Sequence, residues 1–204
     1  MKIFFPHGFT LIELIIVIGV TGILAVVMTD VLTQTLRGQN KVKIINQIKQ
    51  NGQSVLEKMT NEIRQAERVV CVGKITGSSG PDNTLVIFKN GVYTRFRFEP
   101  GLTGQNGKIT AQSWGFESQS NDCTAESSVS EPLLNLTDTD TKNGISIEPK
   151  DSEPIFTPDP KPGYNDNITI KFKATAGVEA GEAYEASVKE GGVLFTTSVG
   201  VKGG

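Results

Sequence analysis

Residues 8 to 13 read Gly8-Phe9-Thr10-Leu11-Ile12-Glu13, and the fifteen residues that follow them carry no charge. The apolar run from Phe9 to Met28 has 20 residues. As a helix such a run is about 30 Å long, which matches the apolar core of a bilayer. A single carboxylate, that of Glu13, therefore lies at the start of a segment of membrane length. Because a charge there costs about 2.5–3.5 kcal/mol on insertion scales, Glu13 requires a partner or a purpose.

Two simpler interpretations of this segment are an ordinary secretory signal and a plain membrane anchor. A secretory signal usually has 7–15 apolar residues, followed by a cleavage site of small residues. The apolar run here is longer, and after Glu13 the next charge is that of Asp30. Neither interpretation accounts for the carboxylate of Glu13.

The hexapeptide, the short leader with its single Lys2 and the apolar run together resemble the processing site of type IV prepilins and type II secretion pseudopilins. The resemblance implies that a prepilin peptidase cuts between Gly8 and Phe9. It also implies that Phe9 becomes the N-methylated mature N-terminus and that Glu13 takes the place of the family's fifth-position glutamate. The implied partners are other pilin or pseudopilin subunits and an inner-membrane assembly platform.

The same resemblance implies where the chain resides. It would cross the inner membrane once, with its C-terminal domain outside the cytoplasm, and would later enter a pilus or pseudopilus.

The charge of Glu13 suggests how such a chain would assemble. Cleavage after Gly8 creates a positive amine on Phe9, one helical turn before Glu13. Between two staggered chains, the amine of an incoming subunit can meet Glu13 of the last one. Opposite charges attract far more strongly in a low dielectric than in water, so this pair would set the axial register.

Composition excludes several classes of function. The chain has 204 residues and a net charge of −2, which becomes −3 when Lys2 leaves with the leader, so no basic excess predicts nucleic-acid binding. Its only histidine, His7, lies in the leader, which excludes His-based catalysis and His-based metal sites from the mature chain. We therefore expect a structural subunit, not an enzyme, with no cofactor and no metal. A calcium loop at 138–144 is the weaker alternative to a solvated turn, because Lys142 occupies a ligand position.

The two cysteines, Cys71 and Cys123, both follow the membrane segment and would share the outer compartment. That compartment oxidises thiols, and an even count of cysteines fits a disulfide. We hypothesise a Cys71–Cys123 bridge that joins the end of the long helix to a later loop. Two free buried thiols are the alternative.

Helical periodicity continues beyond the membrane segment. No proline occurs between Pro6 and Pro81, and apolar residues recur at spacings of three and four. The stripe consists of Val42, Ile45, Ile48, Val55, Met59, Ile63, Ala66 and Val70. We predict one helix from Phe9 to Val70, divided into a membrane and assembly part (9–28) and an amphipathic continuation (29–70). Its stripe would lie on a folded domain, and a free coiled coil is the alternative.

The remaining residues, 71–204, favour a globular β-rich domain. The runs Thr84–Lys89 and Val92–Glu99 flank Asn90-Gly91, which is a strong hairpin signal. Further strands are expected at 108–114, 144–148, 167–174, 184–189 and 193–201, with a turn at Glu190-Gly191-Gly192. An acidic, Pro-rich stretch at 118–163 is expected to be mainly loop. The sum is an α+β fold, a long N-terminal helix on an antiparallel sheet. Of the aromatic residues, Tyr93, Trp114 and Tyr164 are more typical of core than of an exposed ligand surface.

A looser resemblance concerns the C-terminal half. The segments Leu133–Thr137, Asn167–Phe172 and Phe195–Val199 look like the order seen in J-type minor pseudopilins and W-type minor pilins. This implies a minor subunit at or near the tip of a pilus or pseudopilus. A tip adhesin, or a pilin that binds DNA or cargo, is the alternative, although the acidic loop argues mildly against DNA.

Overall fold

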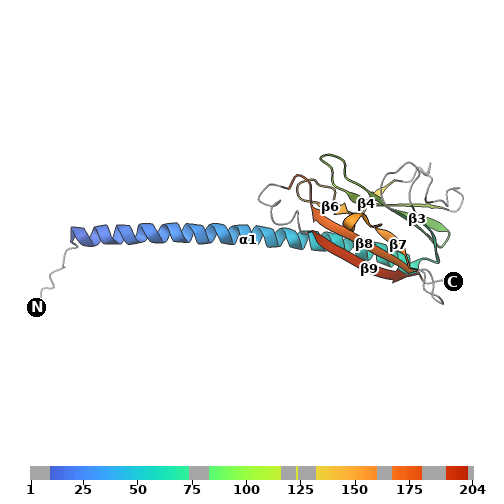
Figure 1. The fold of residues 1–204 in the computed structure, drawn as a ribbon, viewed down its shortest axis with the longest axis horizontal. Helices are drawn as coiled ribbons and strands as arrows, with labels where there is room; N and C mark the ends of the chain where they lie inside the picture. The colour runs from blue at the N-terminus through green and yellow to red at the C-terminus, as the bar shows by residue number, and fades with distance from the viewer. Residues whose placement is uncertain are drawn as a thin grey trace, which may run out of the picture. The chain divides into compact units, whose positions relative to one another are not determined.

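A computed structural model describes residues 10–73, 83–115, 123, 132–159, 167–180 and 192–201 (Figure 1). Its one long helix, α1 (Leu11–Gln65), precedes two antiparallel sheets of five and four strands in the described residues. The chain divides into two compact units, Met1–Lys43 and Ile44–Gly204. The α+β fold expected from the sequence, a long apolar helix followed by antiparallel sheets on which it packs, is confirmed.

The first unit contains the apolar half of α1. In the described residues, α1 is the one helix long and apolar enough to cross a membrane, with a mean hydropathy of 2.7 in its most apolar window. Its large apolar side chains from Leu11 to Leu36 are all more than half exposed. The hydroxyls of Thr21, Thr29 and Thr33 donate to carbonyls one turn earlier at 2.7–2.8 Å. These polar groups are therefore satisfied within the helix, as a bilayer requires.

The second half of α1 packs on the folded unit. Its buried residues recur at spacings of three and four and are Ile48, Gly52, Val55, Leu56, Met59 and Ile63. All of them except Gly52 belong to a core cluster to which both sheets contribute. The predicted stripe therefore lies on a folded domain, and the coiled-coil alternative is wrong. At its start the stripe differs from the prediction, because Val42 is 58% exposed.

The helix ends at Gln65, not at Val70 as predicted. The next element is the strand β1 (Arg68–Gly73), which pairs with β2 (Thr84–Lys89). The change of direction occurs at Glu67, whose N–H donates to the carbonyl of Phe88 at 2.9 Å. The β-branched residues that follow suit a strand better than a helix, and a strand partner is available. The folded unit begins at Ile44 and so already includes the second half of α1.

The first sheet continues from the β2–β3 hairpin. It has the order β1-β2-β3-β4-β5, with β3 at Val92–Glu99, β4 at Lys108–Gly115 and β5 at Leu134–Asn135. Lys89 pairs with Val92 across the turn. Asn90 and Gly91 have φ angles of 50° and 77°, the left-handed conformation that such a turn needs. The hairpin predicted from Asn-Gly is confirmed.

The second sheet is centred on β8 (Asn167–Ala176). β6 (Ile145–Glu148) and β7 (Phe156–Pro158) pair with different parts of β8, and β9 (Val193–Gly200) pairs with it as well. A 3₁₀ turn, η1 (Lys150–Ser152), lies between β6 and β7.

Two strands correct the expectation of a mainly loop-like segment at 118–163. The sequence indicated β6, but it did not indicate β5 or β7. These two strands are two and three residues long, and β7 includes Pro158. Such short strands are too brief to show a period-two pattern. The predicted strand at 184–189, residues 190 and 191 of the predicted turn, and Tyr164 lie outside the described residues.

A smaller core covers the other face of the first sheet. It contains Val86, Tyr93, Trp114 and Cys123. The Tyr93 and Trp114 rings stack with their centroids 5.9 Å apart, and their side chains are 1% and 3% exposed. Both aromatic residues therefore belong to the core, as expected, and neither forms an exposed ligand surface.

Candidate functional site

Glu13 caps the first turn of α1 together with Thr10. The backbone N–H and the hydroxyl of Thr10 each donate to Glu13 Oε2 at 3.3 Å. In return the backbone N–H of Glu13 donates to Thr10 Oγ1 at 3.4 Å. This reciprocal pattern is a capping box, with Thr10 as the N-cap and Glu13 as the third helical residue.

The capping box gives Glu13 a role that the sequence reasoning missed. The signal was present, because Thr10-Leu11-Ile12-Glu13 fits the pattern of Ser or Thr followed three residues later by Glu or Gln. Both bonds from Thr10 use Oε2, so the carboxylate keeps acceptor capacity on Oε1. A carboxylate is also favourable at a helix N-terminus because it faces the positive end of the helix dipole. The described geometry therefore leaves Glu13 able to accept a further cation.

The surroundings of Glu13 are apolar and open. Leu11, Ile12 and Leu14 are 77%, 68% and 56% exposed. A Cβ placed at Gly19 or Gly22 would meet nothing within 4 Å. Lipid or another chain must therefore cover this surface in a membrane or a fibre, because apolar area of this extent is not stable in water. Gly8 and Phe9, the predicted cleavage residues, lie outside the described residues.

Cys71 and Cys123 are joined in the structure, with their Sγ atoms 2.13 Å and their Cα atoms 5.9 Å apart. Cys71 lies on β1, so the bridge starts from a strand and not from the end of the helix as hypothesised. Cys123 is 3% exposed and belongs to the small core with Tyr93 and Trp114. The bridge thus holds residue 123 against the outer face of the first sheet.

Replacing both cysteines by serine should lower the stability of the folded unit. The two residues are 52 positions apart, so the chain-entropy model gives about 4 kcal/mol for the bridge. Urea unfolding of the full chain in detergent, followed by the fluorescence of Trp114, measures the loss. Wild-type protein should also gain the mass of two hydrogen atoms on reduction. An unchanged mass, or equal unfolding midpoints for the two proteins, would show that the bridge does not form.

A groove of about 590 Å³ lies between α1 and the first sheet. Its lining combines apolar side chains with polar ones from α1, the β2–β3 hairpin and β4: Lys58, Asn61, Glu62, Lys89, Asn90, Val92, Thr94, Phe96, Ala111, Ser113, Leu134 and Leu136. Its volume is within the range of small-ligand sites. The groove is therefore a second candidate surface, within the folded unit.

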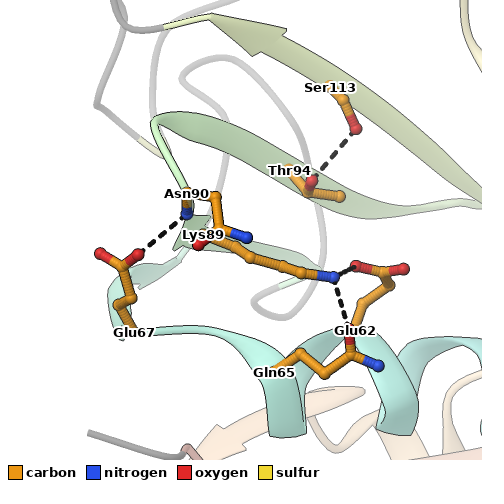
Figure 2. A network of polar contacts seen from close by, with 7 residues as sticks. All are labelled: Glu62, Gln65, Glu67, Lys89, Asn90, Thr94 and Ser113. Carbon is orange, nitrogen blue, oxygen red and sulfur yellow. Dashed lines mark hydrogen bonds and ion pairs between the residues drawn. The ribbon is translucent and has the colours of Figure 1, made fainter. Parts of the chain in front are cut away.

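Figure 2 shows polar contacts made by residues of this groove lining and by their neighbours. Lys89 Nζ forms an ion pair with Glu62 at 3.1 Å and donates to Gln65 at 2.7 Å. The backbone N–H of Asn90 donates to Glu67 at 2.9 Å. Nearby, the hydroxyls of Thr94 and Ser113 are 3.0 Å apart. Lys89 thus fastens the β2–β3 hairpin to the last turns of α1, and Asn90 fastens it to the connection between α1 and β1.

The acidic turn at 138–144 uses its carboxylates internally. The Oδ1 atom of Asp140 accepts the backbone N–H groups of Lys142 at 2.8 Å and Asn143 at 2.9 Å. Asp138 Oδ1 accepts the N–H of Asp140 at 3.0 Å. Among the described residues, no group of three His, Cys, Asp or Glu side chains could hold a metal ion. These hydrogen bonds hold the backbone of residues 138–143 in a tight turn.

These bonds predict a pH dependence for the turn. The N–H groups of Asn143 and Lys142 hold the pKa of Asp140 below its ordinary value of 3.8. The ionised group therefore contributes stability that is present above about pH 3.8 and is lost as pH falls through the lower folded value. The difference in unfolding midpoint between wild type and Asp140→Ala should stay constant from neutral pH to about pH 4 and shrink below it. A difference that grows on acidification would contradict this assignment.

Comparison with known proteins adds one finding. A family model described as the prokaryotic N-terminal methylation motif matches residues 6–29. No curated protein and no solved structure matches the chain. The matched range contains the Gly8–Phe9 junction, the capping box and the apolar run of α1. Such a motif marks a chain that prepilin peptidase processes and that assembles with other pilins into a pilus-like fibre. This chain therefore carries, on a pilin-like α+β fold, the N-terminal methylation motif of the type IV pilin and type II pseudopilin superfamily, whose members are structural and not enzymatic.

Proposed function

We propose that this chain is a minor subunit that lies at or near the tip of a type IV pilus or type II secretion pseudopilus. The observation that carries this proposal is the size of the folded unit, Ile44–Gly204, with its two sheets beyond α1. A subunit in the shaft is packed on both sides by its neighbours along the fibre, whereas a tip subunit is packed on one side only. A large domain is therefore accommodated most readily at the end of the fibre.

Assembly would proceed through the N-terminal segment. Cleavage between Gly8 and Phe9 by prepilin peptidase gives Phe9 a free amine, which is then N-methylated. In the inner membrane, the Glu13 carboxylate of one subunit receives the amine of the next, and this pair sets the axial register. The exposed apolar side chains of α1 pack against neighbouring helices. The inner-membrane assembly platform would bring the subunits together.

The position in the fibre can be tested by labelling and counting. Antibody against the folded unit should mark one end of sheared fibres, and the chain should be scarce compared with the shaft subunit. Deleting its gene should reduce the number of fibres and leave the structure of those that remain unchanged. Labelling along the whole shaft at the abundance of a major subunit would overturn the minor-subunit assignment.

The groove beside α1 favours a second candidate, a tip subunit that binds a target or cargo. Leu134 lies in the groove lining and is 63% exposed. Leu134→Asp should leave fibre formation intact and reduce adhesion or cargo retention. The matched control is Leu102→Asp, which changes a residue that is 72% exposed and lies outside the groove lining. Equal adhesion by the two variants would show that the groove does not bind the target or cargo.

A further inference from the structure

The strand β9 forms one edge of the second sheet in the described residues. It pairs with β8 along its whole length, from Val193 opposite Ala174 to Gly200 opposite Asn167. In the part of the chain that the structure describes, no second strand pairs with it. In Figure 1 it lies beside α1. Its eight residues contain no charge and no proline. A row of unpaired backbone N–H and C=O groups on such a strand is a template for another strand.

The other outer strands in the described residues each carry a feature that hinders pairing. β1 has an irregularity in its register between Val69 and Cys71, and β5 is two residues long. In β6 the N–H of Ile147 already donates to the carbonyl of Gly107 at 2.9 Å. β7 is three residues long and ends in Pro158. Such features are how native proteins block edge pairing, and β9 lacks all of them.

A shallow groove of about 680 Å³ runs between β9 and α1. Its lining includes Leu56 of α1 together with Val193 and Phe195 of β9, which make it partly apolar. Two charged residues of α1, Lys49 and Glu57, also line it. A strand added to β9 would place alternate side chains over this groove.

The charges of Lys49 and Glu57 indicate which sequence an added strand would need. Among the described residues, neither Lys49 nor Glu57 takes part in an ion pair, although Glu57 accepts a hydrogen bond from Gln53 at 3.1 Å. Eight helical residues span about 12 Å, which corresponds to about four residues of strand. Residues four apart on a strand point to the same face. A matching segment would therefore carry an acidic and a basic residue four positions apart, with uncharged residues between them.

We propose that this edge receives an extended segment of a different fibre subunit, which adds a strand to β9 and pairs its acidic and basic residues with Lys49 and Glu57. A second copy of this chain fits less well. Two copies could pair their β9 strands and keep both α1 segments on the same face of the joined sheet only if the two β9 strands ran antiparallel. The subunits of one fibre, in contrast, all run in the same direction. That the segment comes from a fibre subunit rests on the proposed function. Strand addition to β9 is tested without any fibre, so it can fail while the proposed function holds, and the reverse is also true.

The test uses the full chain in detergent micelles and a nine-residue peptide. The peptide is threonine throughout except for Glu at its third, Val at its fifth and Lys at its seventh position. Residue-resolved amide hydrogen exchange should slow at least about tenfold at alternate residues of β9, because only every second N–H faces outward. Lys49→Glu should weaken peptide binding about tenfold. Lys43→Glu, the same charge change on α1 outside the groove lining, should not.

Two control peptides complete the test. The first carries N-methyl groups on those alternate backbone amides that would donate hydrogen bonds to β9. The second has Lys in place of its Glu. We expect the first not to bind and the second to bind more weakly. Equal binding of the N-methylated peptide, or no protection at β9, would overturn strand addition. Protection that appears without peptide and rises with protein concentration would assign the edge to a second copy and overturn the proposed partner.

Discussion

Glu13→Gln should insert into the membrane normally and be incorporated into fibres at least about tenfold less than wild type. Two unit charges 4 Å apart attract by about 4 kcal/mol at an effective dielectric constant of 20, and a tenfold change needs only about 1.4 kcal/mol. Glutamine keeps an oxygen that can accept the two bonds of the capping box from Thr10. The substitution therefore removes the charge and retains the cap. The amount of the chain in sheared fibres, relative to the membrane fraction, measures the effect.

Thr10→Ala is the matched control, because it removes the hydroxyl of the cap and retains the carboxylate. Loss of an N-cap costs about 1 kcal/mol of helix stability, and this variant should assemble at close to the wild-type level. The opposite result, with Thr10→Ala defective and Glu13→Gln normal, would show that Glu13 serves the helix terminus and not the contact between subunits.

Gly52→Leu should destabilise the folded unit by at least about 2 kcal/mol, because it overfills the contact between α1 and β9. A Cβ placed at Gly52 would lie 2.3 Å from Cζ of Phe195. That ring cannot move freely, since it is 7% exposed and stacks on Phe172 with centroids 5.2 Å apart. Urea unfolding of the full chain in detergent measures the effect. Gly38→Ala, at a helical glycine with nothing within 4 Å of its added Cβ, should not destabilise the unit.

A double substitution tests the cause of this effect. In a Phe195→Ala background the space at Gly52 is free, so Gly52→Ala should become neutral or stabilise the helix by up to about 1 kcal/mol. If Gly52→Ala has the same effect with and without the Phe195 ring, steric conflict with that ring is not the reason for the glycine.

The sequence predicted those parts of the fold in which local signals agree with tertiary contacts. The stripe at Ile48, Val55 and Met59 indicated which face of α1 is buried, and Asn90-Gly91 located the hairpin turn. The end of α1 could not be predicted, because Val70 continues the helical spacing. Residues 68–73 form the strand β1 instead of a further turn of helix because they pair with β2, which lies later in the chain.

The candidate site was predicted in part. The charge of Glu13 is conspicuous among apolar residues, and its pairing with Thr10 follows a local capping pattern that the sequence already contains. The count of cysteines suggested a bridge, yet only the structure places Cys71 on a strand. The position of β9 at an edge of the described sheet could not be predicted, because it depends on which strands become neighbours.

The most direct test of the whole account is the mass of the N-terminal peptide from chains isolated in sheared fibres. We predict a peptide that begins at Phe9, carries one added methyl group and lacks residues 1–8. A chain in fibres that still begins at Met1, or one cut after the apolar run in the manner of a secretory signal, would contradict processing at Gly8 and assembly through Glu13.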